Sequence, residues 1–462
     1  MSDSVQRLID RLDTAAFPMH GLLVQQHGRT VCEAYWGPFG PETPHRMYSV
    51  SKSVTALGIG ILIGDGKLKL SDTVASYFPD LLPESSHPYV MQTTVRDLLR
   101  MATPHSHTSY TVQDPAWVDT FFRMQPSHPS GTLFAYDTAG TTVLSALMER
   151  ITGGPMLAFF QKRLFGPLGF SRDVRWVETP EGVQWGGSGL ICTLRDMAKL
   201  ARLCLQKGKW NGEQLVPAWY IEEATTRQID NTGTGYAGYG YQIWVMKNGF
   251  QFYGMGSQYA FCYPRKDLII ACTGDTQLNG ARAATLLQQW VDVEFAQEAG
   301  ELVPRDAPVQ QLPLHSVMGE LHSPISERIN GARFRLAPNA MSIEELRLTL
   351  DQENGCFRYQ KKGKEHTIHF GLGHLAEGEF PECYFGRRIG TLQDTGYRYL
   401  ASAAWVEPKS LLLRVHIVDD YLGGLCIRIA FKGDMVSLQM EKSAEWFLED
   451  YQGFAGGERI AD

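Results

Sequence analysis

Residues 48–80 read YSVSKSVTALGIGILIGDGKLKLSDTVASYFPD, and this stretch is the most informative part of the 462-residue chain. It opens with Ser49-Val50-Ser51-Lys52, a Ser-x-x-Lys pattern, and continues into an apolar run without proline. The run predicts a helix over about 49–64, which would place Ser49 and Lys52 one turn apart on the same face. A serine hydroxyl is a weak nucleophile that needs a base within hydrogen-bond reach. Lys52 is the predicted base, because a desolvated lysine near other positive charge can lose its proton.

The sequence on either side predicts one antiparallel sheet built from both ends of the first 300 residues. Strand-like runs at 21–26 and 30–36 enclose His27-Gly28-Arg29, which is typical of a hairpin. Four more such runs follow at 239–246, 250–253, 258–264 and 267–273, with Asn248-Gly249 as a turn. Apolar spacing predicts helices at 94–101, 139–152, 155–164, 194–206 and 280–295, the fourth with Thr193 as N-cap and Asp196 as its partner. The expected fold class is α/β of the α+β type, with helices on an antiparallel sheet and a helical subdomain.

A proline cluster marks the predicted domain boundary. Pro304, Pro308 and Pro313 interrupt both helix and sheet, so we expect a first domain over 1–303, a linker over 304–313 and a second domain over 314–462. The second domain carries strand-like runs at 357–360, 366–370, 397–406, 410–418, 425–431 and 435–440. They predict a mostly antiparallel sandwich or barrel. Lys361, Lys362 and Lys364 stand beside one run and are interpreted as a solvated turn.

Composition excludes several classes of function. The net charge is −7, which argues against a nucleic-acid partner. No run of about 18 apolar residues predicts a membrane span, and the amphipathic N-terminus does not look like a signal peptide, so we expect a cytoplasmic protein. The eight cysteines are scattered without a C-x-x-C pair, and H-E-x-x-H is absent. The cysteines are therefore expected to be small buried hydrophobes, and the sequence predicts neither a metal nor an organic cofactor.

Further phrases follow Ser49-Val50-Ser51-Lys52 in a fixed order. They are Thr93–Leu99, Ser130–Thr138 with Tyr136-Asp137-Thr138 at its end, Pro167-Leu168-Gly169, and Gly187–Leu190 followed by Thr193–Ala198. With the opening stretch they resemble the serine hydrolases that include class C β-lactamases, penicillin-binding proteins and family VIII esterases. The resemblance runs from about residue 21 to 290. It implies the fold of that family, with Ser49 as nucleophile, Lys52 as activating amine and Tyr136 as a second group that moves the proton.

Two positions depart from the family pattern. The asparagine of the family's Tyr-x-Asn is Thr138, so the contact to a substrate amide is in doubt. The family's Lys-Thr-Gly or His-x-Gly strand is best matched by Met255-Gly256-Ser257-Gln258, where Met255 replaces the basic residue that would hold a carboxylate. The resemblance still implies an oxyanion hole, because that hole uses the backbone N–H groups of Ser49 and Gln258.

The sequence therefore predicts a serine hydrolase that forms a Ser49 acyl-enzyme on an ester, amide or β-lactam-like substrate. Because Met255 removes a cation, esterase or amidase activity is favoured over β-lactamase or carboxypeptidase activity. The alternative is a non-catalytic protein on the same fold that binds a ligand or peptidoglycan. The expected partner is a small or peptide-like acyl compound. For the second domain, shaping of the cleft mouth, partner binding and homodimer formation stay open.

Overall fold

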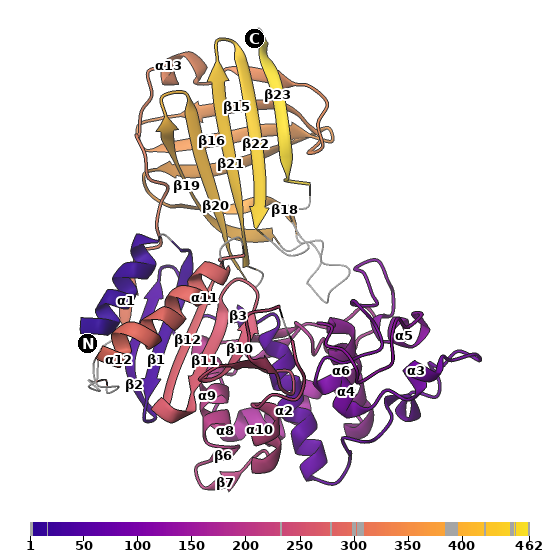
Figure 1. Ribbon diagram of the computed structural model, residues 1–462. Helices are drawn as coiled ribbons and strands as arrows, with labels where there is room; N and C mark the ends of the chain where they lie inside the picture. Colours follow the sequence, from indigo (N-terminus) through magenta and orange to yellow (C-terminus); the bar gives the residue numbers. More distant parts are fainter. Residues whose placement is uncertain are drawn as a thin grey trace. The chain divides into compact units, whose positions relative to one another are not determined.

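In the computed structural model the described residues are 3–15, 17–231, 233–277, 280–297, 302, 309–383, 396–419, 422–443, 448 and 450–460. Those up to Leu312 form one compact unit, and those from Pro313 onward form a second (Figure 1). Residues 304–308 of the predicted linker lie outside the described residues.

An eight-stranded sheet forms the centre of the first unit. Its strand order is β13-β2-β1-β12-β11-β10-β9-β8, so strands from the two ends of the unit lie side by side. All neighbours are antiparallel except β13 and β2, which run parallel. In chain order the strands are β1 (Met19–Gln26), β2 (Arg29–Trp36), β8 (Gly238–Tyr239), β9 (Trp244–Met246), β10 (Gly249–Gly254), β11 (Gln258–Tyr263), β12 (Leu268–Gly274) and β13 (Gln310–Leu312).

Helices cover both faces of this sheet, which explains why its central strands are apolar throughout. Every residue of β11 and β12 is buried, whereas the strands of a sheet with one solvent-exposed face would alternate apolar and polar residues. Helices α1, α11 and α12 lie together on one side, and α9 packs on the other against β1, β11 and β12 (Figure 1). The predicted cap of α9 is confirmed, because Thr193 and Asp196 form a capping box.

Between the two groups of strands the chain forms mostly helices. The α-helices of this unit are α1 (Asp3–Thr14), α2 (Val50–Gly64), α3 (Pro88–Met91), α4 (Val95–Leu99), α5 (Trp117–Arg123), α6 (Thr138–Thr152), α7 (Met156–Phe160), α8 (Gly166–Leu168), α9 (Leu194–Leu205), α10 (Ala218–Ala224), α11 (Gly280–Gln289) and α12 (Phe295–Gln297). Single-turn 3₁₀ and π segments are η1 (Val74–Tyr77), η2 (Gln161–Phe165), η3 (Pro264–Lys266) and η4 (Trp290–Glu294). Two small sheets pair β3 (His45–Arg46), β5 (Leu190–Cys192) and β4 (Arg175–Trp176), and β6 (Lys209–Trp210) with β7 (Glu213–Gln214).

The second unit is a closed barrel. Ten strands follow the order β17-β16-β15-β14-β23-β22-β21-β20-β19-β18, and a parallel contact between β17 and β19 closes the sheet. The strands are β14 (Arg333–Leu336), β15 (Ile343–Leu350), β16 (Asn354–Lys361), β17 (Lys364–Leu372), β18 (Ala376–Cys383), β19 (Gly396–Glu407), β20 (Ser410–Val418), β21 (Leu422–Lys432), β22 (Met435–Ser443) and β23 (Gly453–Ile460), with one helix, α13 (Ser326–Ile329). The prediction of a mostly antiparallel β domain is confirmed.

Lys361 departs from its predicted place in a solvated turn. Its side chain is only 2% exposed, and its Nζ lies 2.7 Å from Glu382 Oε1 and 3.4 Å from Asp450 Oδ2. The amine also lies over the ring of Tyr451, at 4.1 Å from the centroid. Lys362, at 62% exposure and with φ of 51°, does occupy the turn. The prediction was wrong for Lys361 because Glu382 of β18 and Asp450, which precedes β23, supply its counter-charges from distant parts of the sequence.

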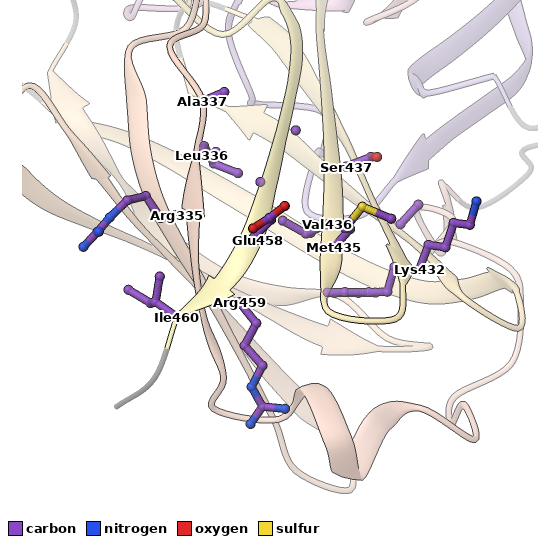
Figure 2. Close-up of a pocket in the computed structure, with 14 residues that line it drawn as sticks. Arg335, Leu336, Ala337, Lys432, Met435, Val436, Ser437, Glu458, Arg459 and Ile460 are labelled. Carbon is purple, nitrogen blue, oxygen red and sulfur yellow. The ribbon is translucent and has the colours of Figure 1, made fainter.

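A trough of about 790 Å³ crosses the outer face of the barrel (Figure 2). Its floor is a row of small residues that are in register across four strands: Ala337, Gly456, Ser437 and Ala430. The neighbouring row has long side chains and forms a wall: Arg335, Glu458, Met435 and Lys432. A side chain at Gly456 would enter open space, because an added Cβ meets no atom within 4 Å.

Two further observations complete the fold. Within the described part of the chain, no helix combines the length and the apolar character that crossing a bilayer requires. Six cysteines are buried free thiols, as predicted, while Cys426 is partly exposed. The side chain of Cys383 lies outside the described residues.

Candidate active site

Ser49 stands immediately before the first residue of α2, where it is the N-cap. The turn is tight, because the N–H groups of Val50 and Ser51 donate to the carbonyls of Met47 and Tyr48. Tyr48 has φ of 46°, a left-handed conformation that non-glycine residues rarely adopt. The helix N-terminus places its positive potential at Ser49, where a developing alkoxide would be stabilised.

Lys52 lies within hydrogen-bond distance of Ser49, as the sequence predicts. Its Nζ is 3.1 Å from Ser49 Oγ, and the whole residue is only 1% exposed. The same amine donates to the carbonyl of Gly187 at 2.6 Å. When Lys52 is neutral, this contact can hold the amine while its lone pair accepts the hydroxyl proton of Ser49.

Tyr136 lies beside this pair. The ring centroid is 5.1 Å from Lys52 Nζ, and the ring stacks on Trp244 at 5.6 Å with an angle of 22°. Burial of the hydroxyl raises the pKa of Tyr136 well above 10, and a hydrogen bond with Ser49 opposes this in part. Although 37% of the residue is exposed, the hydroxyl end is the buried end because it lies against Ser49. Near neutral pH Tyr136 is therefore a phenol, which can donate a proton.

The two residues after Tyr136 form the start of α6. Asp137 is the fully buried N-cap and accepts hydrogen bonds from the backbone of Ala139 and Gly140. Burial raises its pKa to about 6. Thr138 does not line the cavity; its backbone N–H donates to Thr108 Oγ1 at 3.0 Å. The structure therefore brings Thr138 close to the predicted pair without giving its side chain a place in the cavity wall.

The segment from Met255 to Gln258 divides between the cavity and the core. Met255 and Gly256 line the cavity. Ser257 is fully buried and its hydroxyl bonds to Thr276, so its side chain cannot reach a ligand. The Gln258 side chain donates to the carbonyls of Met255 and Gly274, both at 2.9 Å. Only the backbone of Gln258 is left for the predicted oxyanion contact.

The cavity beside Ser49 has a volume of about 560 Å³. Aromatic rings form much of its wall, and Tyr253 stacks on Tyr259 at 4.7 Å. The other lining residues are Ser49, Tyr136, Trp244, Met255, Gly256, Gln277, Gly280, Ala281 and Arg282. A small acyl compound of mixed character fits such a space better than a charged polymer.

Sequence reasoning missed three features of this site. Arg282, from α11, is the charged residue among those that line the cavity. Gln277 presents a carboxamide whose nitrogen and oxygen are buried and have no hydrogen-bond partner among the described residues. The carbonyl of Gly187 is the second contact of Lys52. Gly187 belongs to a phrase that the family resemblance includes, but nothing in the sequence indicates that its carbonyl contacts Lys52. Nor does any sequence signal connect Gln277 or Arg282 with Ser49, which lies more than 200 positions earlier.

In the part of the chain that the structure describes, no group of three or more His, Cys, Asp or Glu side chains is arranged to hold a metal ion.

Comparison with known proteins bears on the same region. The family model named Beta-lactamase matches residues 5–290. A 6-aminohexanoate-dimer hydrolase from Paenarthrobacter ureafaciens is 26% identical over 216 residues, which cover 43% of this chain and 55% of that enzyme. The chain thus spans about half the length of this curated relative.

Solved structures share the fold at low sequence identity. EstCE1, a hydrolase with promiscuous acyltransferase activity, superposes with a TM-score of 0.53 at 18% identity over 63% of this chain and 98% of its own. An octameric penicillin-binding protein homologue from Pyrococcus abyssi reaches 0.52 at 16% identity over 99% of this chain and 100% of its own. At such identities the likeness concerns the fold alone.

Proposed function

Because this chain belongs to the β-lactamase family, we propose that it is a serine hydrolase that acts through an acyl-enzyme on Ser49. One observation carries the proposal: the buried amine of Lys52 lies 3.1 Å from Ser49 Oγ, at a cavity that Ser49 itself lines. A buried lysine within hydrogen-bond distance of a serine at the start of a helix, beside a cavity, favours a catalytic role.

The reaction would proceed in two half-reactions. Neutral Lys52 accepts the hydroxyl proton while Ser49 Oγ bonds to the carbonyl carbon of the substrate. The backbone N–H groups of Ser49 and Gln258 would stabilise the oxyanion. Tyr136, protonated because burial raises its pKa, donates a proton to the leaving group and recovers one from Lys52. Water then attacks the acyl carbon, and its proton passes to Lys52. The bond between the acyl carbon and Ser49 Oγ breaks, Lys52 returns the proton to Ser49 Oγ, and the acid is released.

The cavity wall supports a substrate class. Aromatic faces suit an apolar acyl or alkyl body, and Arg282 suits a carboxylate at one end. The unpartnered carboxamide of Gln277 could pair with a substrate amide. We therefore favour an ester or a linear amide with an anionic end. The relative named as a 6-aminohexanoate-dimer hydrolase acts on a compound of this general type.

Covalent labelling tests the proposal. Wild type, Ser49→Ala and Ser51→Ala would be treated with a fluorophosphonate, a p-nitrophenyl ester and a fluorescent penicillin, and adducts read by intact mass. We expect adducts on wild type and on Ser51→Ala, and none on Ser49→Ala. If the folded wild type formed no adduct with any probe, the enzyme proposal would fail. A ligand-binding protein on the same fold, which the departures at Thr138 and Met255 favour, would replace it.

Arg282 can be tested separately. Arg282→Met should raise KM about tenfold for an ester that carries a terminal carboxylate, since a charge-assisted hydrogen bond contributes about 1.5–3 kcal/mol. KM for a neutral ester of the same length should stay unchanged. An equal loss on both esters would show that Arg282 does not recognise the carboxylate.

A further inference from the structure

A buried arginine lies next to the nucleophile segment. Arg46 ends β3, three residues before Ser49, and only 1% of it is exposed. Its Nε donates to the backbone carbonyl of Ser188 at 3.1 Å, and its Nη2 donates to Ser188 Oγ at 3.2 Å. Arginine is rarely buried so deeply, and the cost of desolvation requires that its N–H groups find acceptors.

The same guanidinium also lies over two aromatic rings. Its central carbon lies 4.7 Å from the ring centroid of Tyr48 and 5.1 Å from that of Trp185. Tyr48 is the strained residue directly before Ser49, and Trp185 begins the segment that contains Ser188. Arg46 therefore connects the nucleophile segment with the segment 185–188.

The segment 185–188 holds the second contact of Lys52. The carbonyl of Gly187, which accepts from Lys52 Nζ at 2.6 Å, belongs to the peptide that joins Gly187 to Ser188. Gly186 and Gly187 must be glycines, because a Cβ at Gly187 would lie 2.5 Å from Thr138 Cγ2 and one at Gly186 would lie 2.8 Å from Ser145. Two adjacent glycines leave the backbone free to turn, so the carbonyl keeps its direction only if its neighbours are held.

We propose that Arg46 is a positioning residue for the acylation step. Its guanidinium fixes Ser188 and Tyr48 together, so that the Gly187 carbonyl keeps the Lys52 amine against Ser49 Oγ. Arg46 takes no part in proton transfer itself. Arginine suits this place better than lysine, because its planar guanidinium reaches both acceptors of Ser188 and also lies over the rings of Tyr48 and Trp185. The inference rests on the proposed function of Ser49 and Lys52.

Two substitutions separate the effect of the planar guanidinium donors of Arg46 from the effect of its positive charge. Arg46→Met keeps a long side chain but has no N–H donors. Arg46→Lys keeps the positive charge but replaces the planar guanidinium with a single ammonium group. We expect both to slow single-turnover acylation by a p-nitrophenyl ester about 10- to 100-fold, as a misplaced catalytic group does, with KM changed less than twofold. Arg202→Met is the control. It removes the ion pair between Arg202 of α9 and Asp267, and it should acylate at the wild-type rate. Full rescue by Arg46→Lys would overturn the proposal, because charge alone would then suffice.

Ser188→Ala tests whether Arg46 acts on the Gly187 carbonyl through Ser188. It removes one of the two acceptors of Arg46 and should slow acylation two- to fivefold. In the double variant Arg46→Met/Ser188→Ala the rate should equal that of Arg46→Met, because both changes break one connection. Multiplied effects would show that Arg46 does not act through Ser188.

Amide hydrogen exchange provides a readout that needs no activity. In Arg46→Met the amides of 185–190 should exchange at least tenfold faster, whereas Arg202→Met should leave them protected. Unchanged exchange together with unchanged acylation would overturn the role of Arg46. If wild type forms no acyl-enzyme, the proposed function fails instead. Faster exchange in 185–190 would in that case leave Arg46 only as a brace of the fold and would overturn its role in acylation.

Discussion

The cavity beside Ser49 and the trough on the barrel differ in what their walls offer. The trough is the larger, at about 790 Å³ against about 560 Å³. Its floor is small side chains and backbone, and its charged wall residues include Arg335, which is already paired with Glu345. The cavity has a hydroxyl, a phenol and an unpartnered amide directed into it, with a buried amine behind the hydroxyl. A catalytic site needs polar groups that are buried and fixed in position, although their burial costs desolvation energy. The residues that line a pocket are therefore a better guide to its function than its volume.

The same contrast extends to the buried charges of the two units. In the barrel, Lys361 is surrounded by carboxylates that match its charge. In the first unit, Lys52 is buried against a hydroxyl, a carbonyl and a phenol ring, and its charge also acts on the buried carboxyl of Asp137. The two lysines differ in their nearest contacts: carboxylates for Lys361, and a serine hydroxyl at a cavity for Lys52, which is the arrangement that the proposed proton transfer needs.

Lys52→Met should give the largest effect on turnover. Loss of the base should lower kcat/KM for a p-nitrophenyl ester by about 10²- to 10⁴-fold, with little change in Tm because methionine fills the same space. Lys67→Met, at an exposed lysine just beyond the same helix, should behave as wild type. Retained turnover in Lys52→Met would remove the distinction between the two buried lysines.

Acid should destabilise the first unit through His45. His45 Nε2 lies 3.1 Å from His20 Nδ1, and His45 Nδ1 lies 3.1 Å from the Thr43 carbonyl. Nδ1–H therefore donates to Thr43, and Nε2 must be unprotonated to accept from His20. Burial lowers the pKa of His45 from 6.5 to about 4. The unfolded chain binds this proton first, so the contribution to stability is complete above pH 6.5 and falls as the pH approaches 4. The loss is about 1.4 kcal/mol by pH 5.5 and about 3 kcal/mol by pH 4.

Urea unfolding of wild type and His45→Gln between pH 4 and 8 measures this loss as a difference. The difference matters because other groups titrate in the same range. Burial lowers the pKa of His416 in the barrel to about 3, and it raises the pKa of Asp137 to about 6, which acts in the opposite direction. The same pH dependence in both proteins would contradict the assignment to His45.

Lys361→Met should destabilise the barrel and leave catalysis intact. Its partners Glu382 and Asp450 are 34% and 48% exposed, so water can solvate them once the amine is gone. We expect a loss of about 1–2 kcal/mol, below the value for a fully buried pair, with unchanged kcat/KM. Lys362→Met, at the exposed neighbour, is the matched control and should unfold like wild type. A loss of turnover at unchanged stability would show that the barrel takes part in the reaction.

Gly456→Leu should have the smallest effect. The new side chain fills the trough without a clash, so stability should change by less than about 0.5 kcal/mol and turnover not at all. Gly457→Leu is the opposite case, because a Cβ there would lie 2.2 Å from the Arg335 carbonyl, and the barrel should unfold. Reduced turnover in Gly456→Leu at wild-type stability would give the trough a function.

Much of the first unit could be predicted because its signals are local. The hairpin, the helix after Ser49 and the Thr193 cap depend on neighbours in sequence, and a three-residue spacing alone placed Lys52 beside Ser49. Arg282, Gln277 and the Gly187 carbonyl could not be found this way, because tertiary packing alone brings them to Ser49. In the barrel, β14, β15, β18 and β23 were missed. The glycines of β23 weaken its strand pattern, and neighbouring strands supply the pairing that holds it.

Apart from the roles of the site residues and the substrate, three further expectations stay predictions. They are the cytoplasmic location, the division of the chain at 304–313, and a homodimer through the second domain. Light scattering on the full chain would test the last of them.

The strand order of the first unit has a consequence for synthesis. β1 pairs with β12, so Leu22 meets Cys272 across some 250 residues, and the sheet cannot close until the later strand has left the ribosome. Until then the hairpin of β1 and β2 has two unpaired edges, because β13, which pairs with β2, comes later still, and its apolar faces are uncovered. Contacts so distant in sequence also slow folding, since a long loop must close before they form. A nascent chain stalled before residue 268 should therefore depend on chaperones, while one that extends past 312 should not.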